Sequence, residues 1–133
     1  ISAIRVESGL DTGDIYLKKE LSLEGSAKAI FERANHLIFK MILEIIKLNP
    51  SPIKQIGQPY SFKRRTPEMS SIKDLEKLKE IFDYIRMLDA DGYPNAYLET
   101  ENFKFEFRRA SLKDNKSIQA DVKISLKKID NKV

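Results

Sequence analysis

The residues that could do chemistry stand near the start of the chain, in the run Asp11-Thr12-Gly13-Asp14. Asp-Thr-Gly is the signature of aspartic proteases, in which two such loops bring two carboxylates together to share one proton. One copy per chain would require a homodimer, and the long helices predicted below disagree with that almost wholly β class. Asp, Thr and Gly are also good turn formers, so the four residues taken alone are explained by a simple hairpin turn.

A second candidate site is the basic run Lys63-Arg64-Arg65, close to Tyr60 and Phe62. Arginine side chains can bind phosphate oxygens through two parallel hydrogen bonds. A solvated loop, or arginines that brace a junction between domains, would give the same run. Metal binding is not expected, because the chain has no cysteine and its one histidine, His36, falls inside a predicted helix where a structural or solvent-facing role is typical.

These candidates depend on the elements around them. Residues 1–7 and 15–21 are β-prone and flank the acidic loop, which predicts strand, loop and strand. From residue 26 to residue 48, apolar residues recur at three- and four-residue spacing, which predicts a helix ended by Pro50. Such an apolar stripe needs a surface to cover, and two strands supply little of one. We therefore expect part of a sheet to lie outside this sequence.

The second half of the chain changes pattern twice. Residues 71–88 have helical spacing, and Ser71 with Asp74 predicts a capping-box start. After Pro94 the period becomes two, so Phe103, Phe105 and Phe107 share one strand face, which we expect to be buried although such a stripe could also stack nucleic-acid bases. A turn is expected at residues 113–116, before a strand at residues 122–127.

Composition bounds the class of protein. The chain has 133 residues, 41% hydrophobic and 33% charged, with a formal net charge of +4. These values are typical of a water-soluble domain, and the excess of basic residues is small enough for an ordinary solvated surface. Neither a signal peptide nor a run of about 20 apolar residues is present, so we expect a cytoplasmic protein. We expect this sequence to begin, at Ile1, inside a folded unit.

The joint pattern resembles a family. Four parts of the chain are similar to 10-formyltetrahydrofolate-dependent formyltransferases. They are the run from Val6 through Asp14 to Ile15, the segment 21–25 before the long helix, the glutamines Gln55 and Gln58, and the run 62–67 (Phe-Lys-Arg-Arg-Thr-Pro). The resemblance covers the first half of the chain best. It implies an α/β fold, in which residues 1–50 form the C-terminal edge of a Rossmann-like catalytic domain, 51–70 a connecting loop, and 71–133 a helix with a small antiparallel, OB-like β-unit.

The resemblance also implies roles. Asp11 matches the active-site aspartate that organises proton transfer as an amine attacks the formyl carbon, and Leu10, Asp11, Thr12 and Gly13 would contact the folate. Lys63, Arg64 and Arg65 would bind a phosphate of the acceptor. The partner asparagine and histidine of the family precede this loop, so the isolated chain is expected to be inactive.

The Arg-Arg-Thr-Pro run and the short tail favour an amino sugar linked to a nucleotide as the acceptor. Methionyl-tRNA is the alternative acceptor. A second alternative is a non-catalytic module for binding or homodimerisation.

Overall fold

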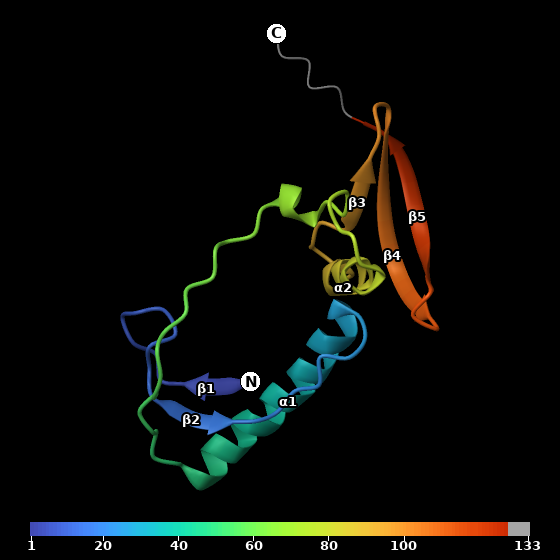
Figure 1. Cartoon of the computed structure of the whole chain (residues 1–133). Helices are drawn as coiled ribbons and strands as arrows, with labels where there is room; N and C mark the ends of the chain where they lie inside the picture. Colours follow the sequence, from blue (N-terminus) through green and yellow to red (C-terminus); the bar gives the residue numbers. More distant parts are fainter. Residues whose placement is uncertain (128–133) are drawn as a thin grey trace. The chain divides into compact units, whose positions relative to one another are not determined.

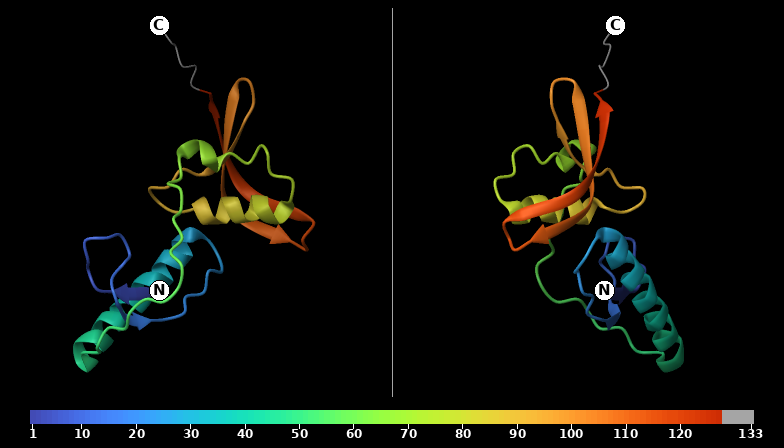
Figure 2. Two further views of the ribbon diagram at one scale, coloured as in Figure 1. Left: turned by 60° about the vertical axis from the view of Figure 1, so that its left-hand side comes forward. Right: turned by 90° about the vertical axis from the view of Figure 1, so that its right-hand side faces the viewer.

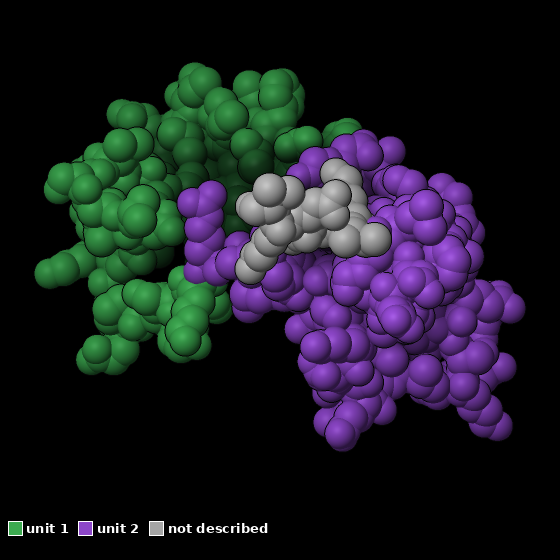
Figure 3. Space-filling model, turned by 90° about the horizontal axis from the view of Figure 1, so that it is seen from above, with its two compact units in different colours: residues 1–24, 29–63 green, residues 25–28, 64–133 purple. Residues whose placement is uncertain are grey.

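A computed structural model describes residues 1–127 of the chain (Figure 1). The described residues contain two small antiparallel sheets, with strand orders β1-β2 and β3-β4-β5, together with the helices α1 and α2 and one 3₁₀ turn, η1. They form two compact units (Figure 3). Unit 1 comprises residues 1–24 and 29–63, and unit 2 comprises residues 25–28 and those from 64 onward. The boundary after residue 63 falls inside the predicted loop 51–70. The division into domains at residues 50 and 70 stays a prediction, and residues 128–133 of its last domain lie outside the described part.

In unit 1, a β-hairpin with a long loop carries the acidic residues. Strand β1 (Ser2–Ile4) pairs antiparallel with β2 (Ile15–Lys18), in a register that places Ala3 opposite Leu17. The backbone of Ile53 adds a further bridge, because Ile15 and Ile53 exchange two N–H···O bonds of 2.8 and 2.9 Å. The chain after α1 therefore returns to lie beside the start of β2.

Helix α1 (Ala27–Leu48) confirms the strongest helical pattern of the sequence. Its buried face includes Ile30 and Met41, which are 6% and 2% exposed. In unit 1, the Lys19 ammonium lies 2.9 Å from the Glu44 carboxylate and ties the end of β2 to this helix. Helix α1 ends at Leu48 because Pro50 follows closely, and Asn49 adopts a positive φ of 44°, which asparagine tolerates better than most residues.

A second side of α1 is apolar but exposed. Phe39, Ile42 and Ile46 are 63%, 49% and 73% exposed. Their spacing places them on one broad stripe of the helix, roughly a quarter to a half turn away from Ile30 and Met41. Unit 1 therefore presents an apolar helix surface larger than the two-stranded sheet covers.

In unit 2, helix α2 (Leu78–Leu88) is shorter than predicted, and the capping box at Ser71 and Asp74 is wrong. Ser71 forms a parallel bridge with Tyr97, and the Ile72 N–H donates to the Tyr97 carbonyl at 2.9 Å. These pairings hold residues 71–72 in an extended conformation, so the helix begins only after Lys77. The tertiary partner outweighs the local helical preference.

The sheet of unit 2 consists of three strands, β3 (Ala96–Glu99), β4 (Phe103–Lys113) and β5 (Ser117–Leu126). The predicted turn is confirmed: Asp114 and Asn115 both have positive φ, 48° and 53°, where the chain reverses between β4 and β5. The two views of Figure 2 show that β4 and β5 form a long twisted hairpin, with α2 lying across one face of it.

The phenylalanine face is only partly buried, which corrects the sequence-based prediction. Phe107 packs against the core of unit 2, which centres on Ile85, Leu88 and Ala96. Phe103, at the other end of the same face, is 43% exposed. Helix α2 has 11 residues and spans about 16 Å at 1.5 Å per residue, so it is too short to cover the whole length of the hairpin.

A β-bulge interrupts β4 between Arg108 and Ser111, where Arg109 takes a positive φ of 50°. The bulge inserts one residue, so the inward positions change from odd numbers (Phe107) to even numbers (Ala110). The buried carboxylate of Asp89, just after α2, accepts the Arg109 backbone N–H at 2.8 Å and the Arg108 Nε–H at 3.0 Å. Asp89 thereby fixes the bulge against the end of α2.

The observed fold class is mixed helix and antiparallel sheet. A parallel pairing joins only the single residues Ser71 and Tyr97 within the described chain. The Rossmann-like edge and the OB-like unit that the sequence analysis expected therefore stay predictions, while the order of strands, long helix, helix and small sheet is confirmed.

Candidate functional site: the Asp11 loop

The acidic residues lie on a ten-residue loop that connects β1 to β2. At the neck of this loop, the Arg5 N–H donates to the Asp14 carbonyl at 2.8 Å, and the Arg5 guanidinium lies 3.7 Å from the Asp14 carboxylate. A hydrogen bond with the Tyr16 side chain raises the pKa of Arg5 above its usual value, with smaller contributions from Tyr16, Asp14 and Glu7 charges. The neck is thus closed by a permanently charged arginine.

Gly13 is required by this neck. A Cβ built on Gly13 would lie 1.8 Å from the carbonyl oxygen of Arg5, closer than any non-bonded pair can approach. Asp11 has a positive φ of 53°, in the left-handed region that aspartate visits more readily than most residues. Asp11 and Gly13 are therefore suited to the backbone conformation of this loop, independently of any chemistry that the Asp11 carboxylate performs.

The side chains at the tip of the loop are exposed. Leu10 is 96% exposed, and Asp11 and Thr12 are also exposed, with the Thr12 hydroxyl donating to the Gly9 carbonyl at 3.2 Å. The four residues predicted to contact folate thus lie on one continuous stretch of loop. Their contact with folate stays a prediction.

A side chain from far along the chain fixes this loop. The Gln55 Nε2 amide donates to the Asp11 carbonyl at 2.8 Å and to the Gly13 carbonyl at 2.7 Å. The bridge between Ile15 and Ile53 brings Gln55 to this position, since it follows Ile53 by two residues. In the sequence, Gln55 stands out only as part of the family pattern, because no local signal links residues separated by more than 40 positions.

His36 does not join Asp11. It lies exposed on α1, and its Nδ1 is 2.8 Å from the Glu32 carbonyl oxygen of the same helix. A surface pocket beside it is lined by residues of α1 and of the segment before it, including Arg33, and Asp11 is not among them. Of the two roles expected for this histidine, structural or solvent-facing, its exposure fits the solvent-facing one.

The three residues of the basic run differ in their contacts. Arg65 donates to the Met69 carbonyl at 2.7 Å, and its guanidinium lies 5.4 Å from the centre of the Tyr84 ring. These contacts hold η1 (Pro67–Ser70) against α2 within unit 2, so Arg65 stabilises the interior of one unit, and a role at a junction between domains stays a prediction. Lys63 and Arg64 are exposed, and their predicted role in binding phosphate stays a prediction.

Next to this run, the Thr66 side chain forms a hydrogen bond with the Glu68 side chain at the start of η1. Its hydrogen bond lowers the pKa of the Glu68 carboxyl below its usual value, aided by the backbone of Glu68 itself. The Thr-Pro pair of the motif thus starts a 3₁₀ turn, with proline in its first positions.

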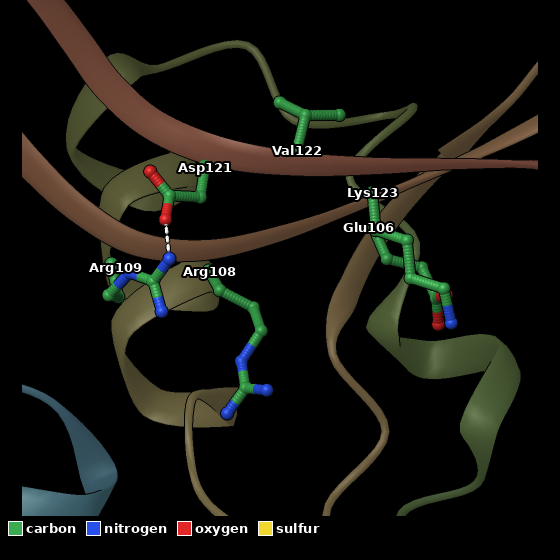
Figure 4. A pocket seen from close by; sticks show the side chains of 6 residues that line it. All are labelled: Glu106, Arg108, Arg109, Asp121, Val122 and Lys123. Atoms are coloured by element: carbon green, nitrogen blue, oxygen red, sulfur yellow. Dashed lines mark hydrogen bonds and ion pairs between the residues drawn. The ribbon is translucent and has the colours of Figure 1, made fainter.

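A surface pocket lies beside the bulge of β4 (Figure 4). It is lined by Glu106, Arg108, Arg109, Asp121, Val122 and Lys123. Figure 4 shows the ion pair between Arg109 and Asp121 across the hairpin, and Arg108 pairs with Asp89. Its arginines are thus already neutralised by carboxylates of unit 2.

Two further observations bound the chemistry of the described residues. Among residues 1–127, no group of three or more His, Asp or Glu side chains is placed to hold a metal ion. Neither α1 nor α2 is long and apolar enough to cross a membrane.

The chain is similar to known proteins over two different ranges. Residues 67–125 match the family model of the methionyl-tRNA formyltransferase C-terminal domain. Among solved structures, a methionyl-tRNA formyltransferase from Clostridium thermocellum is similar, with 48% sequence identity and a TM-score of 0.89. The match covers 95% of this chain and 56% of that one. No curated protein matches the chain.

These two matches confirm the resemblance to the formyltransferase family found in the sequence. Within that family, both matches bear the description methionyl-tRNA formyltransferase. The chain spans little more than half the length of the similar enzyme.

Proposed function

We propose that this chain is part of an enzyme that transfers a formyl group from 10-formyltetrahydrofolate to the primary amine of methionyl-tRNA. The observation that carries this proposal is the 48% identity over 95% of the chain to a methionyl-tRNA formyltransferase. The family model over residues 67–125 supports the same acceptor. The preferred prediction from the sequence, an amino sugar linked to a nucleotide, gains no support from either match, so the alternative becomes the main proposal.

In this proposal Asp11 is the catalytic residue of the described chain. As the amine attacks the formyl carbon, positive charge develops on its nitrogen, and a carboxylate nearby stabilises that charge. The same carboxylate can orient a histidine that accepts the proton. Leu10, Thr12 and Gly13 shape the loop surface that faces the folate. Charge stabilisation of this kind is typically worth about 10²–10³ in kcat.

Other reacting groups would come from polypeptide that this sequence does not contain. The exposed stripe of α1, with Phe39, Ile42 and Ile46, supports this view, because a soluble domain seldom leaves such a helix face uncovered. The greater length of the similar enzyme is consistent with it. The chain by itself would then be inactive in formyl transfer.

The test uses the full-length protein that contains this chain. Formyl transfer is measured with methionyl-tRNA and, in parallel, with a nucleotide-linked amino sugar, for the wild type and for Asp11→Asn. We expect activity with methionyl-tRNA and a decrease in kcat of about 10²-fold or more in the variant. Activity with the amino sugar alone would refute the acceptor, and an unchanged kcat in Asp11→Asn would refute the catalytic role.

Asp14→Asn provides the matched control. It removes the same charge from the same loop, but its carboxylate pairs with Arg5 at 3.7 Å, and both side chains are more than a third exposed. Pairs of this kind contribute about 0–1 kcal/mol to stability. A large loss of kcat in both variants would mean that the loop needs its negative charge in general and not the carboxylate of Asp11.

One specific observation favours a second function, homodimerisation through unit 2. Strand β5 is an edge strand, and Val122, Ile124 and Leu126 on its apolar face are 46%, 61% and 76% exposed. An edge strand with an exposed apolar face is a template for pairing with another strand. Pairing with β5 of a second copy would extend the sheet and the apolar face together.

The charges on the other face of β5 fit such a pairing. If two β5 strands pair antiparallel about Ile124, Val122 lies opposite Leu126 of the partner subunit. In the same register Asp121, which pairs with Arg109 in its own subunit, lies opposite Lys127 of the partner subunit, and the two-fold axis repeats this contact; Lys127 pairs with Glu99 within its own chain, so the contact would join two existing ion pairs. Opposite charges directly across a strand pair contribute roughly 0.2–1 kcal/mol each.

Sedimentation of the chain tests this function. We expect a dimer for the wild type and a monomer for Ile124→Lys, which places a charge at the centre of the proposed interface. Gln119→Lys is the control, because Gln119 is exposed on the opposite face of the same strand. A monomeric wild type would exclude dimerisation, and a monomer in both variants would show that added charge alone disrupts assembly.

A further inference from the structure

We infer that Gln55 is a positioning residue, which holds the Asp11 loop in the conformation needed for formyl transfer. The inference rests on the proposed role of Asp11 and adds a residue that acts on Asp11 through the backbone. It starts from the two hydrogen bonds of the Gln55 side-chain amide, to the Asp11 carbonyl at 2.8 Å and to the Gly13 carbonyl at 2.7 Å.

The two acceptors determine the orientation of the amide. Both neighbours are carbonyl oxygens, which can only accept, so the NH₂ group and not the oxygen of Gln55 must face them. Each of the two amide hydrogens then serves one carbonyl. A glutamine fits this requirement, whereas a glutamate in its ionised form has no hydrogen to donate.

The two carbonyls bracket the part of the loop that is hardest to hold. Asp11 has a φ of 53°, and Gly13 packs against the Arg5 carbonyl so closely that no Cβ fits. A positive φ at a residue with a side chain costs roughly 1–2 kcal/mol, so a free loop would tend to leave this conformation. The Gln55 amide bonds the residue with the positive φ and the glycine two positions later, and it thereby opposes that tendency.

The segment that carries Gln55 is itself fixed to the hairpin. Ile15 and Ile53 exchange backbone hydrogen bonds of 2.8 and 2.9 Å, one residue after the loop ends and two residues before Gln55. The amide therefore reaches the loop from a backbone in register with β2. Since Asp11 is exposed and its carbonyl is bound, the Gln55 amide fixes the backbone from which the Asp11 side chain projects.

The test is the isosteric substitution Gln55→Glu in the full-length protein. It keeps the size of the side chain, removes both donors, and places a negative charge against two carbonyl oxygens. The backbone amides of Arg5 and Ile15, which donate to the Asp14 and Ile53 carbonyls, report on the loop through hydrogen exchange. We expect their protection to fall about 10-fold and kcat with methionyl-tRNA to fall by a similar factor or more, with a smaller change in KM for the acceptor.

Gln58→Glu is the matched control for hydrogen exchange. It makes the same charge change three residues later, in the same extended segment, and within the described chain Gln58 takes part in no hydrogen bond. Unchanged protection of Arg5 and Ile15 in this variant would attribute the effect to the lost donors of Gln55. An equal loss in both variants would overturn the inference.

The two proposals fail in different ways. If protection and kcat both fall in Gln55→Glu, the positioning role stands. If protection is unchanged, Gln55 does not hold the loop and the inference is overturned. If protection falls but kcat does not, while Asp11→Asn is inactive, Gln55 holds the loop without positioning Asp11, which also overturns it. If Asp11→Asn is fully active, the proposed catalytic role fails, and the inference fails with it whatever the protection shows.

Discussion

The carboxylate of Asp89 supplies the sharpest test of the fold of unit 2. Its side chain is 9% exposed and accepts two hydrogen bonds at the β4 bulge, one from the Arg109 backbone N–H and one from the Arg108 guanidinium. In Asp89→Ala, the Arg109 N–H loses a charged acceptor, which costs about 1.5–3 kcal/mol. The pair with Arg108 adds at most about 1 kcal/mol, because that side chain is 44% exposed. We therefore expect a loss of about 2–4 kcal/mol in the free energy of unfolding.

Urea denaturation measures this loss in the free energy of unfolding. Unfolding is monitored through hydrogen exchange of the β4 and β5 amides, so that unit 2 is observed separately from unit 1. Asp91→Ala is the control: Asp91 also pairs with Arg108, at 3.8 Å, but its side chain is 87% exposed. Its loss should stay within about 0.5 kcal/mol. Asp89→Asn keeps one acceptor oxygen and should fall between the two. If Asp89→Ala also stays within about 0.5 kcal/mol, the bulge does not depend on this carboxylate and the reasoning is refuted.

Two further substitutions test backbone requirements. Gly13→Ala should destabilise unit 1 by about 1–3 kcal/mol, because its Cβ would meet the Arg5 carbonyl. Gly9→Ala is the control and should destabilise unit 1 less, because its Cβ would meet only the rotatable side chain of Thr12, at 2.7 Å. An equal loss of stability in both variants, measured by urea denaturation, would contradict the steric reason. Asn115→Gly should stabilise unit 2 by about 0.5–1 kcal/mol, because glycine adopts the positive φ of 53° without strain; a lower midpoint of unfolding would show that the asparagine side chain stabilises the turn.

Much of the local structure followed from the sequence because the responsible interactions are close along the chain. The apolar spacing from residue 26 to residue 48 predicted α1, and Pro50 predicted its end. Lys113 through Lys116 predicted the reversal between β4 and β5, since Asp and Asn tolerate positive φ. The glycine-rich acidic run predicted a loop between two strands, which β1 and β2 confirm.

Other elements were missed where a distant partner decides the conformation. The bridge between Ser71 and Tyr97 delays the start of α2, although residues 71–77 continue the helical spacing. The bulge at Arg109 shifts the inward positions of β4 by one residue, which the alternation of Phe103, Phe105 and Phe107 does not predict, and the strand continues to Lys113. Asp89 stabilises that shift from 20 residues away, and no local pattern contains this information.

In the candidate site, too, local features were predictable from the sequence and contacts between distant residues were not. The sequence by itself determined which residues could do chemistry, because the Asp-Thr-Gly run is a family pattern and glycine and aspartate are the types its backbone requires. Only the tertiary structure showed that Gln55 bonds the loop and that His36 lies elsewhere, on the exposed surface of α1. The physical reason is that Gln55 and the loop are more than 40 positions apart along the chain, and the Ile15–Ile53 bridge that brings the two backbones together is itself a tertiary pairing with no local signal.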